Sequence, residues 1–242
     1  MNKISIKRTF AYILAVLLIV GILSIISGLI FFFMEILGVN TKKEDNFKTE
    51  ITNLRKENIK KINVDLKYAD LSILKSKDLK IESDNKNINI KEENDEVKIE
   101  EKGVKSKISF GANNKRSKLK IYIPENMNFQ NVKINSEVGK IDIENLITDN
   151  LKIEAGIGNI FLKAKVEKMA KIEAGIGKIN YDILNDPNDI NIKIERGLGQ
   201  VYFNDSKLEE DEIGNGKVKI GIEAGIGKVE IFNKEKRVNT LN

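Results

Sequence analysis

The sequence predicts an all-β domain of the β-solenoid or β-helix type, built from short repeated strands and preceded by one N-terminal transmembrane helix. Three observations lead to this prediction. A long uncharged apolar run lies near the N-terminus. From residue 62 onward, apolar and polar residues alternate with the period of two that marks half-buried strands. From residue 134 onward, a ten-residue pattern occurs five times.

Residues 10–34 are expected to form the membrane anchor, because residues 9–34 contain no charged side chain. A helix of ~25 residues is roughly 37 Å long, enough to cross a hydrocarbon core of ~30 Å. A cleaved signal peptide is the alternative, but the run is longer than an ordinary signal core and no A-x-A-like site follows. Lys3, Lys7 and Arg8 precede the span. The positive-inside rule therefore places the N-terminus in the cytoplasm and the chain after about residue 40 outside the cell.

The other boundaries follow from changes in composition and period. The expected order is a cytoplasmic tail (1–9), the anchor (10–34), a juxtamembrane spacer (35–60), an extracytoplasmic β-repeat domain (61–233) and a tail (234–242). In the spacer, Phe47, Ile51 and Leu54 have helical spacing and indicate one short helix. Strands are expected in KINVDL (61–66), DLKIES (78–83), NINIK (87–91), EVKIE (96–100) and KLKIYIP (118–124).

Composition excludes several kinds of site. The chain has no Cys, His or Trp, which removes disulfides, thiolate chemistry, His-based triads and the usual zinc sites. Part of the net charge of +5 belongs to the cytoplasmic tail, and the remainder is nearly balanced. The pI near 9.0 therefore does not indicate nucleic-acid binding.

The five copies are aligned here by positions 1 to 10. They are INSEVGKIDI (134–143), IEAGIGNIFL (153–162), IEAGIGKINY (172–181), IERGLGQVYF (194–203) and IEAGIGKVEI (222–231). Their first residues are 19, 19, 22 and 28 residues apart, a spacing typical of a solenoid. The longer intervals contain NDPND (185–189) and SKLEEDEIGNGK (206–217), which are expected to be loop insertions.

Each copy places apolar or small residues at positions 1, 3, 5, 8 and 10, so the strand phase changes between positions 5 and 8. Position 6 is always glycine: Gly139, Gly158, Gly177, Gly199 and Gly227. Glycine adopts positive φ at no steric cost, so this residue is expected to bend the chain while both flanking strands face one core. The bend is either a corner between faces of a right-handed solenoid or a type II′ hairpin turn. The constant spacing favours the solenoid.

The glycines do not indicate a nucleotide site. The P-loop pattern requires four residues between its glycines and a Ser or Thr after the Lys, whereas five residues separate Gly221 and Gly227 and Val229 follows the Lys. The dinucleotide fingerprint lacks its third glycine. No nucleotide or other cofactor is therefore expected.

The outer face of the copies carries regular rows of side chains. Position 2 holds Glu154, Glu173, Glu195 and Glu223, and the residue before position 1 is Lys133, Lys152, Lys171 or Lys193. In parallel coils such residues lie about 4.8 Å apart. These rows indicate a solvated face, with a cation site on the glutamate row as the alternative. Position 4 holds Gly156, Gly175, Gly197 and Gly225. This column either leaves a shallow groove for a partner or relieves crowding at a corner.

A basic segment extends from Lys102 to Lys120. It is expected either to bind anions, such as lipid headgroups or cell-wall polyanions, or to pair with the acidic stretch 92–101 that precedes it.

KLKIYIPENMNFQNVKINSEVGKIDIENL (118–146) resembles the core of the LiaG-like putative-adhesin domain family of unknown function. IKKINVDLKYADLSIL (59–74) and the repeats extend the resemblance over about residues 60–233. The resemblance implies an N-terminal anchor and an extracytoplasmic solenoid-like domain in a Gram-positive cell envelope. It supplies no catalytic residues.

The expected function is therefore a non-enzymatic binding or scaffold module of the bacterial cell envelope, with a link to envelope stress as one hypothesis. Its expected partners are its own membrane and a cell-wall polymer or envelope protein. Two alternatives remain. A polysaccharide-active enzyme would need two carboxylates about 5–10 Å apart, one with a raised pKa. An accessory subunit of a membrane complex would use the small residues Gly21, Ser24, Ser27 and Gly28 of the anchor.

Overall fold

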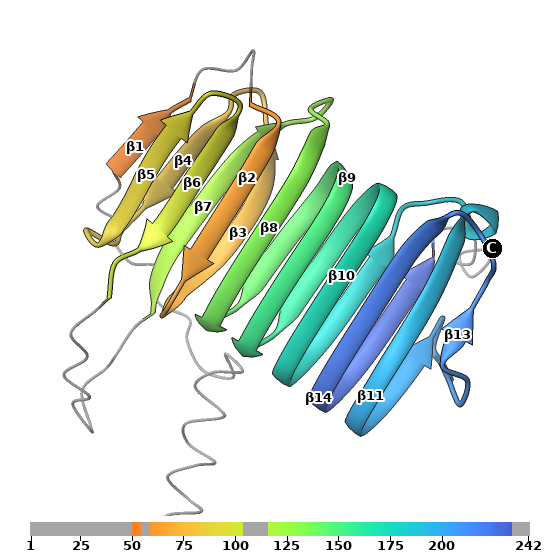
Figure 1. Ribbon diagram of the computed structural model, residues 1–242. Helices are drawn as coiled ribbons and strands as arrows, with labels where there is room; N and C mark the ends of the chain where they lie inside the picture. Colours follow the sequence, from red (N-terminus) through yellow and green to blue (C-terminus); the bar gives the residue numbers. More distant parts are fainter. Residues whose placement is uncertain (1–49, 55–58, 104–115, 234–242) are drawn as a thin grey trace, which may run out of the picture. The chain divides into compact units, whose positions relative to one another are not determined.

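The computed structural model describes residues 50–54, 59–103 and 116–233 (Figure 1). The expected anchor, residues 10–34, lies outside these ranges. Within them, no helix is long and apolar enough to span a membrane.

The described chain is all-β, as expected, with a single 3-10 turn at Pro187–Asp189. The strands are β1 (Glu50–Asn53), β2 (Lys61–Leu66), β3 (Ala69–Ser76), β4 (Lys80–Ser83), β5 (Ile88–Glu93), β6 (Glu96–Glu101), β7 (Ser117–Pro124), β8 (Phe129–Val138), β9 (Ile141–Ile157), β10 (Ile160–Ile183), β11 (Ile190–Phe203), β12 (Ser206–Lys207), β13 (Glu212–Ile213) and β14 (Val218–Asn233). Every segment predicted from the period of two overlaps one of these strands.

The strands form two faces that enclose one core. Face A contains β5, β6, β2 and β8, and face B contains β1, β4, β7 and β3. The long strands β9, β10, β14 and β11 pass through a corner and contribute to both faces (Figure 1). We call a rung one strand of face A, the glycine corner after it and the following strand of face B.

Neighbouring copies pair in parallel and in register. Ile153 of the second copy lies beside Ile134 of the first, and Ile172 of the third lies beside Ile153. A hairpin at the glycine would have paired each copy antiparallel with itself. The solenoid-like corner is therefore correct and the hairpin alternative is wrong.

The order of the rungs differs from the order of the copies in the chain. Ile222 of the fifth copy pairs with Ile172 of the third copy on one side and with Ile194 of the fourth copy on the other. The fifth copy therefore lies inside the stack, and the fourth copy is the terminal rung. The interval after the fourth copy is more than a loop, because its strands β12 and β13 run antiparallel along the outer edge of β11.

The N-terminal end of the stack contains two rungs that lie outside the five copies. Val64, Leu71 and Ile73 lie beside the residues at positions 1, 8 and 10 of the first copy, so β2 and β3 form one rung. β6 and β7 form the next rung outward, because they pair in parallel with β2 and β3. The antiparallel strands β5, β4 and β1 lie beyond them. Such covering strands keep a regular parallel edge from pairing with other chains.

The short helix expected in the spacer is wrong. Residues 50–53 form β1 instead, which pairs antiparallel with β4, and Leu54 is buried. Three apolar residues at helical spacing are a weak signal, and a tertiary contact with a sheet edge outweighs it.

The core contains the aliphatic side chains of positions 1 and 3 from face A and positions 8 and 10 from face B. In the second copy these are Ile153, Ala155, Ile160 and Leu162, all of them buried. Position 5 was expected in the core as well, but Ile226 is 50% exposed and Leu198 is 75% exposed. The chain has already begun to turn outward at this position, because the corner starts before the glycine.

Candidate functional site

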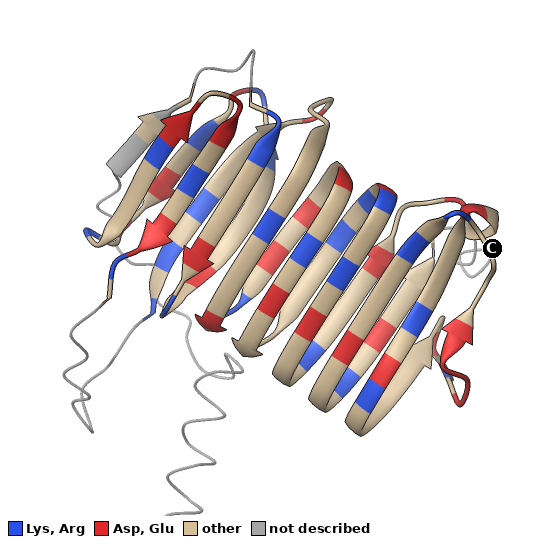
Figure 2. Cartoon of the chain, viewed as in Figure 1, with Lys and Arg blue, Asp and Glu red and all other residues tan. Residues whose placement is uncertain are grey.

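The glutamates of position 2 lie in one row on the outside of face A. In-register pairing places Glu154 beside Glu173, Glu173 beside Glu223, and Glu223 beside Glu195. Asn135 and Asp65 continue the row toward the N-terminal end of the stack. Acidic and basic side chains form alternating bands across this face (Figure 2). The predicted row of glutamates is therefore present in the structure. Its last two members, Glu223 and Glu195, follow each other in the reverse of their chain order.

Lysines two residues earlier in the chain neutralise most of this row. Lys152 pairs with Glu154 at 2.7 Å, and Lys171 forms an ion pair with Glu173. The hydrogen bond from Lys152 lowers the pKa of Glu154. Glu223 differs, because the residue two positions before it is Gly221, and within the described ranges it has no ion-pair partner.

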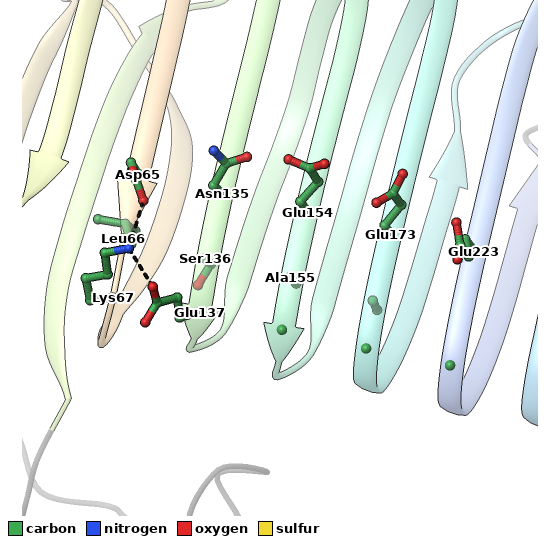
Figure 3. Close-up of a pocket in the computed structure, with 14 residues that line it drawn as sticks. Asp65, Leu66, Lys67, Asn135, Ser136, Glu137, Glu154, Ala155, Glu173 and Glu223 are labelled. Carbon is green, nitrogen blue, oxygen red and sulfur yellow. Dashed lines mark hydrogen bonds and ion pairs between the residues drawn. The ribbon is translucent and has the colours of Figure 1, made fainter.

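The cation site on this row stays a prediction. The part of the chain that the structure describes contains no group of three or more acidic side chains arranged to hold a metal ion. Neighbouring carboxylates of a row point outward in parallel rather than toward a common centre (Figure 3).

The glycines at position 4 are required by the neighbouring rung. A Cβ on Gly156 would lie 2.5 Å from the carbonyl oxygen of Glu137, and one on Gly175 would lie 2.6 Å from that of Gly156. Crowding therefore explains why these residues lack side chains. The same column leaves an open hollow between the glutamate row and the corner.

We call this hollow the corner groove; its volume is ≈ 550 Å³ (Figure 3). Its wall is the acidic row, and its floor is the glycine column together with the small residues of position 3. The lining residues are Asp65, Leu66, Lys67, Asn135, Ser136, Glu137, Glu154, Ala155, Gly156, Glu173, Ala174, Gly175, Glu223 and Gly225. Crowding between rungs therefore accounts for the glycine column, and the hollow above it is present. The approach of a partner to this groove stays a prediction.

The glycines at position 6 form a second column, at the corner itself. Gly158, Gly177 and Gly227 have φ of 152°, 149° and 146°. The positive φ expected at every copy is absent at Gly139 and Gly199. A Cβ on those two would still lie 2.3 Å and 1.8 Å from a carbonyl oxygen of the next rung. Close stacking of the corners therefore excludes a side chain at all five.

Between the two glycine columns lies a row of apolar side chains at position 5, which we call the corner ridge. Its members, in stack order, are Val138, Ile157, Ile176, Ile226 and Leu198. All five are at least partly exposed. Sequence reasoning assigned them to the core. The signal that could have corrected this is that the ridge residues other than Val138 stand between two glycines, because a residue flanked in this way has little to pack against on its own face.

The sequence profile of the Toastrack DUF4097 family matches residues 59–221. The chain belongs to this family. The match spans β2 to the first part of β14 and so includes most of the residues of the corner groove and of the corner ridge. The resemblance stated from the sequence, to an adhesin-type domain of unknown function, is thereby confirmed.

A solved structure has a similar fold. A "putative cell adhesion protein" from Clostridium sporogenes is 20% identical, with a TM-score of 0.58 over 77% of this chain and 99% of that one. A "putative adhesin" from Bacteroides fragilis is 13% identical over 76% of this chain and 97% of that one. Its TM-score of 0.33 is too low to show a shared fold. At these identities the likeness shows the fold alone. None of the curated proteins compared with the sequence matches it.

The basic segment of this Toastrack domain is described only at its ends, because residues 104–115 lie outside the described ranges. Arg116 Nε donates to Asp70 Oδ1 at 2.8 Å, and Asp70 Oδ1 also accepts from the backbone N–H of Lys140. At this end, the segment therefore ties the rung of β6 and β7 to its neighbours, and anion binding by the remainder stays a prediction.

Proposed function

We propose that this Toastrack protein is a membrane-anchored, extracytoplasmic binding and scaffold module of the bacterial cell envelope, and that it is not an enzyme. The corner ridge and the corner groove carry the proposal. They give one edge of the domain an exposed apolar strip beside an acidic hollow, repeated in register from rung to rung. A regular surface of this kind suits an extended polymer or another protein.

The carboxylates favour binding over hydrolysis. A glycosidase needs one carboxyl group whose pKa is raised so that it can act as the general acid. Hydrogen bonds from lysines instead lower the pKa of Glu154, of Glu82 and of Glu230, the last to about 2. Groups of this kind are ionised at neutral pH and can attract or orient a ligand but cannot protonate a leaving group.

Membrane topology can be tested with single cysteines, because the natural chain contains none. The full chain carrying Met169→Cys should react with a membrane-impermeant maleimide in intact cells. A chain carrying Asn2→Cys should react only after the cells are permeabilised. Labelling of Met169→Cys that requires permeabilisation would contradict the proposed orientation.

Binding can be tested with Ile226→Glu and Leu198→Glu, which place a charge on the most exposed part of the corner ridge. Met169→Glu is the matched control, since Met169 is 55% exposed and lies where the chain passes from face B back to face A. The purified full chain in detergent is mixed with cell-wall material and with solubilised membrane proteins. We expect the two ridge variants to retain less material than the wild type or the control. Equal retention by all four proteins would overturn the assignment of the binding surface.

A further inference from the structure

The corner ridge and the corner groove are adjacent and parallel. The ridge projects between the glycine columns of positions 4 and 6, and the groove is the hollow above the position 4 column. Ridge and groove follow the same rungs, from the first copy to the fifth. A surface with a raised apolar strip beside a hollow of similar length can fit a second copy of itself, because a twofold axis can place each ridge in the other groove.

The ionisable side chains that border the ridge differ in sign on its two sides, and most of them are paired within their own chain. Lys152 and Lys171 pair with the glutamates of one side, and Asp142 and Glu230 pair with the lysines of the other. On the groove side lies the acidic row, represented by Glu154, Glu173 and Glu223. On the other side, at position 7, the side chains are Lys140, Asn159, Lys178, Lys228 and Gln200. These residues follow the corner glycines and begin the outer surface of face B. The ridge is therefore bordered by carboxylates on face A and by lysines or amides on face B.

The fit of ridge into groove selects one of the two possible twofold axes, and the signs of the bordering rows agree with it. An axis perpendicular to the ridge would bring ridge against ridge and the acidic row of one chain against the acidic row of the other. An axis parallel to the ridge would bring the acidic row of each chain against the lysine row of its partner. We propose that the partner bound at this corner is a second copy of the chain, paired in parallel about an axis that follows the ridge. This proposal names the partner of the surface described above and so rests on the proposed function.

The same axis has a second consequence that fits a pair of anchored chains. Because it is parallel to the stack, it places β1 of both chains at the same end of the pair. Two chains whose expected anchors enter one membrane need their β1 strands at the same end. An antiparallel pair would put them at opposite ends.

Disulfide trapping tests the pairing, and the absence of natural cysteine makes it specific. Ile157→Cys, Ile176→Cys and Ile226→Cys are introduced singly into the full chain, which is oxidised in membranes. In a parallel pair each residue lies beside its own equivalent, so all three variants should form disulfide-linked dimers. Met169→Cys serves as the control for random collision. Dimers from Ile176→Cys alone would indicate an antiparallel pair and overturn the proposal, as would equal yields from Met169→Cys.

A charge exchange tests the predicted facing rows. Glu173 and Lys178 belong to the same rung and would face each other across the parallel pair. In the Ile226→Cys background, Glu173→Lys should lower the dimer yield about fivefold, which corresponds to two surface pairs of about 0.5 kcal/mol each. Adding Lys178→Glu should restore it. A yield unaffected by the single exchange, or not restored by the double one, would contradict the proposed axis.

The two proposals fail in different ways. If no ridge cysteine gives a dimer but Ile226→Glu still loses envelope material, the binding function stands and self-pairing is wrong. If dimers form as predicted and no variant changes retention, self-pairing stands and the binding of another envelope component at this corner is wrong.

Discussion

Replacing Gly177 by alanine tests the physical basis of the corner. The residue has φ of 149°, and a Cβ at this position would lie 1.7 Å from the carbonyl oxygen of Gly158 in the neighbouring rung. An ordinary contact of this kind is 3.4–4 Å. The backbone of the two rungs must therefore separate, or the corner must change its conformation. Either response disturbs the hydrogen bond from Gly158 N to Ile176 O, which is 2.9 Å long.

The expected loss of stability has two parts. An L-residue held at an unfavourable positive φ costs of order 1–3 kcal/mol. Losing one backbone hydrogen bond at the corner costs about 1 kcal/mol more. Gly177→Ala should therefore lower the free energy of unfolding by about 3 kcal/mol. The assay is urea unfolding of the full chain in detergent, followed by far-ultraviolet circular dichroism.

Gly221→Ala is the matched control in the same assay. Gly221 precedes position 1 of the fifth copy, and a Cβ on it would have Ala170 O as its nearest neighbour, 3.9 Å away. This variant should be neutral or more stable by about 0.4–1 kcal/mol, because alanine restricts the unfolded chain. If both variants unfold at the same urea concentration, the corner does not require glycine and the steric argument is refuted.

Three further changes have defined outcomes. Tyr181 is fully buried and its hydroxyl has no hydrogen-bond partner, so Tyr181→Phe should raise the free energy of unfolding by about 1 kcal/mol; a lower melting temperature would contradict this. Hydrogen bonds from Lys178 and Lys228 lower the pKa of Glu230 from 4.5 to about 2. Because the folded pKa is the lower one, the contribution of this carboxylate to stability is present above pH 4.5 and is lost as the pH falls toward 2. Glu230→Gln should therefore lower the urea midpoint of unfolding at neutral pH and leave it unchanged near pH 2. An equal effect at both pH values would show that ionisation of Glu230 does not contribute to stability. Arg196 donates to the carbonyl oxygens of the segment between β12 and β13, so Arg196→Ala should speed limited proteolysis within that segment, and unchanged cleavage would show that other contacts hold it.

Local periodicity was sufficient to predict most of the strands and the corners of the five copies. Alternation in KINVDL or EVKIE reflects the pleat itself, since every second side chain enters the core. The constant spacing of the first three copies correctly favoured parallel coils. The row of Glu154 and Glu173 followed directly from that spacing, because equal coils bring equal positions side by side.

The order of the outer rungs could not be predicted in this way. Copies with the same ten-position pattern can pair equally well with one another, so the pattern does not specify which of them are neighbours. One available signal was Arg196, which stands at position 3 where other copies have Ala or Ser. A long charged side chain fits there only at an open end of the stack, where it contacts the covering segment. The β2–β3 rung was missed because Ala69 stands where the other copies have glycine.

The exposure of the corner ridge was the main feature of the candidate site that period counting misplaced. A period of two assigns every second residue to the core until the strand phase changes. The sequence pattern placed that change after position 5. In the structure the strand geometry ends earlier, so Ile226 and Leu198 face solvent. The corner begins earlier because of close contacts with the neighbouring rung. The sequence of a single copy does not contain these contacts.

The inward position of the last copy constrains how the domain is completed and how it can grow. A ribosome delivers β11 before β14, but β11 pairs with β14 and not with β10, so β11 joins the stack only when the final strand has paired. Deleting β14 would therefore open the middle of the stack rather than shorten it. Duplicating a copy at either end would place the new unit outside its covering strands. Only in the β9–β10 region do chain order and stack order agree, so only there can a unit be gained or lost without disturbing the ends. The length of the domain can therefore change only by insertion or deletion inside the stack.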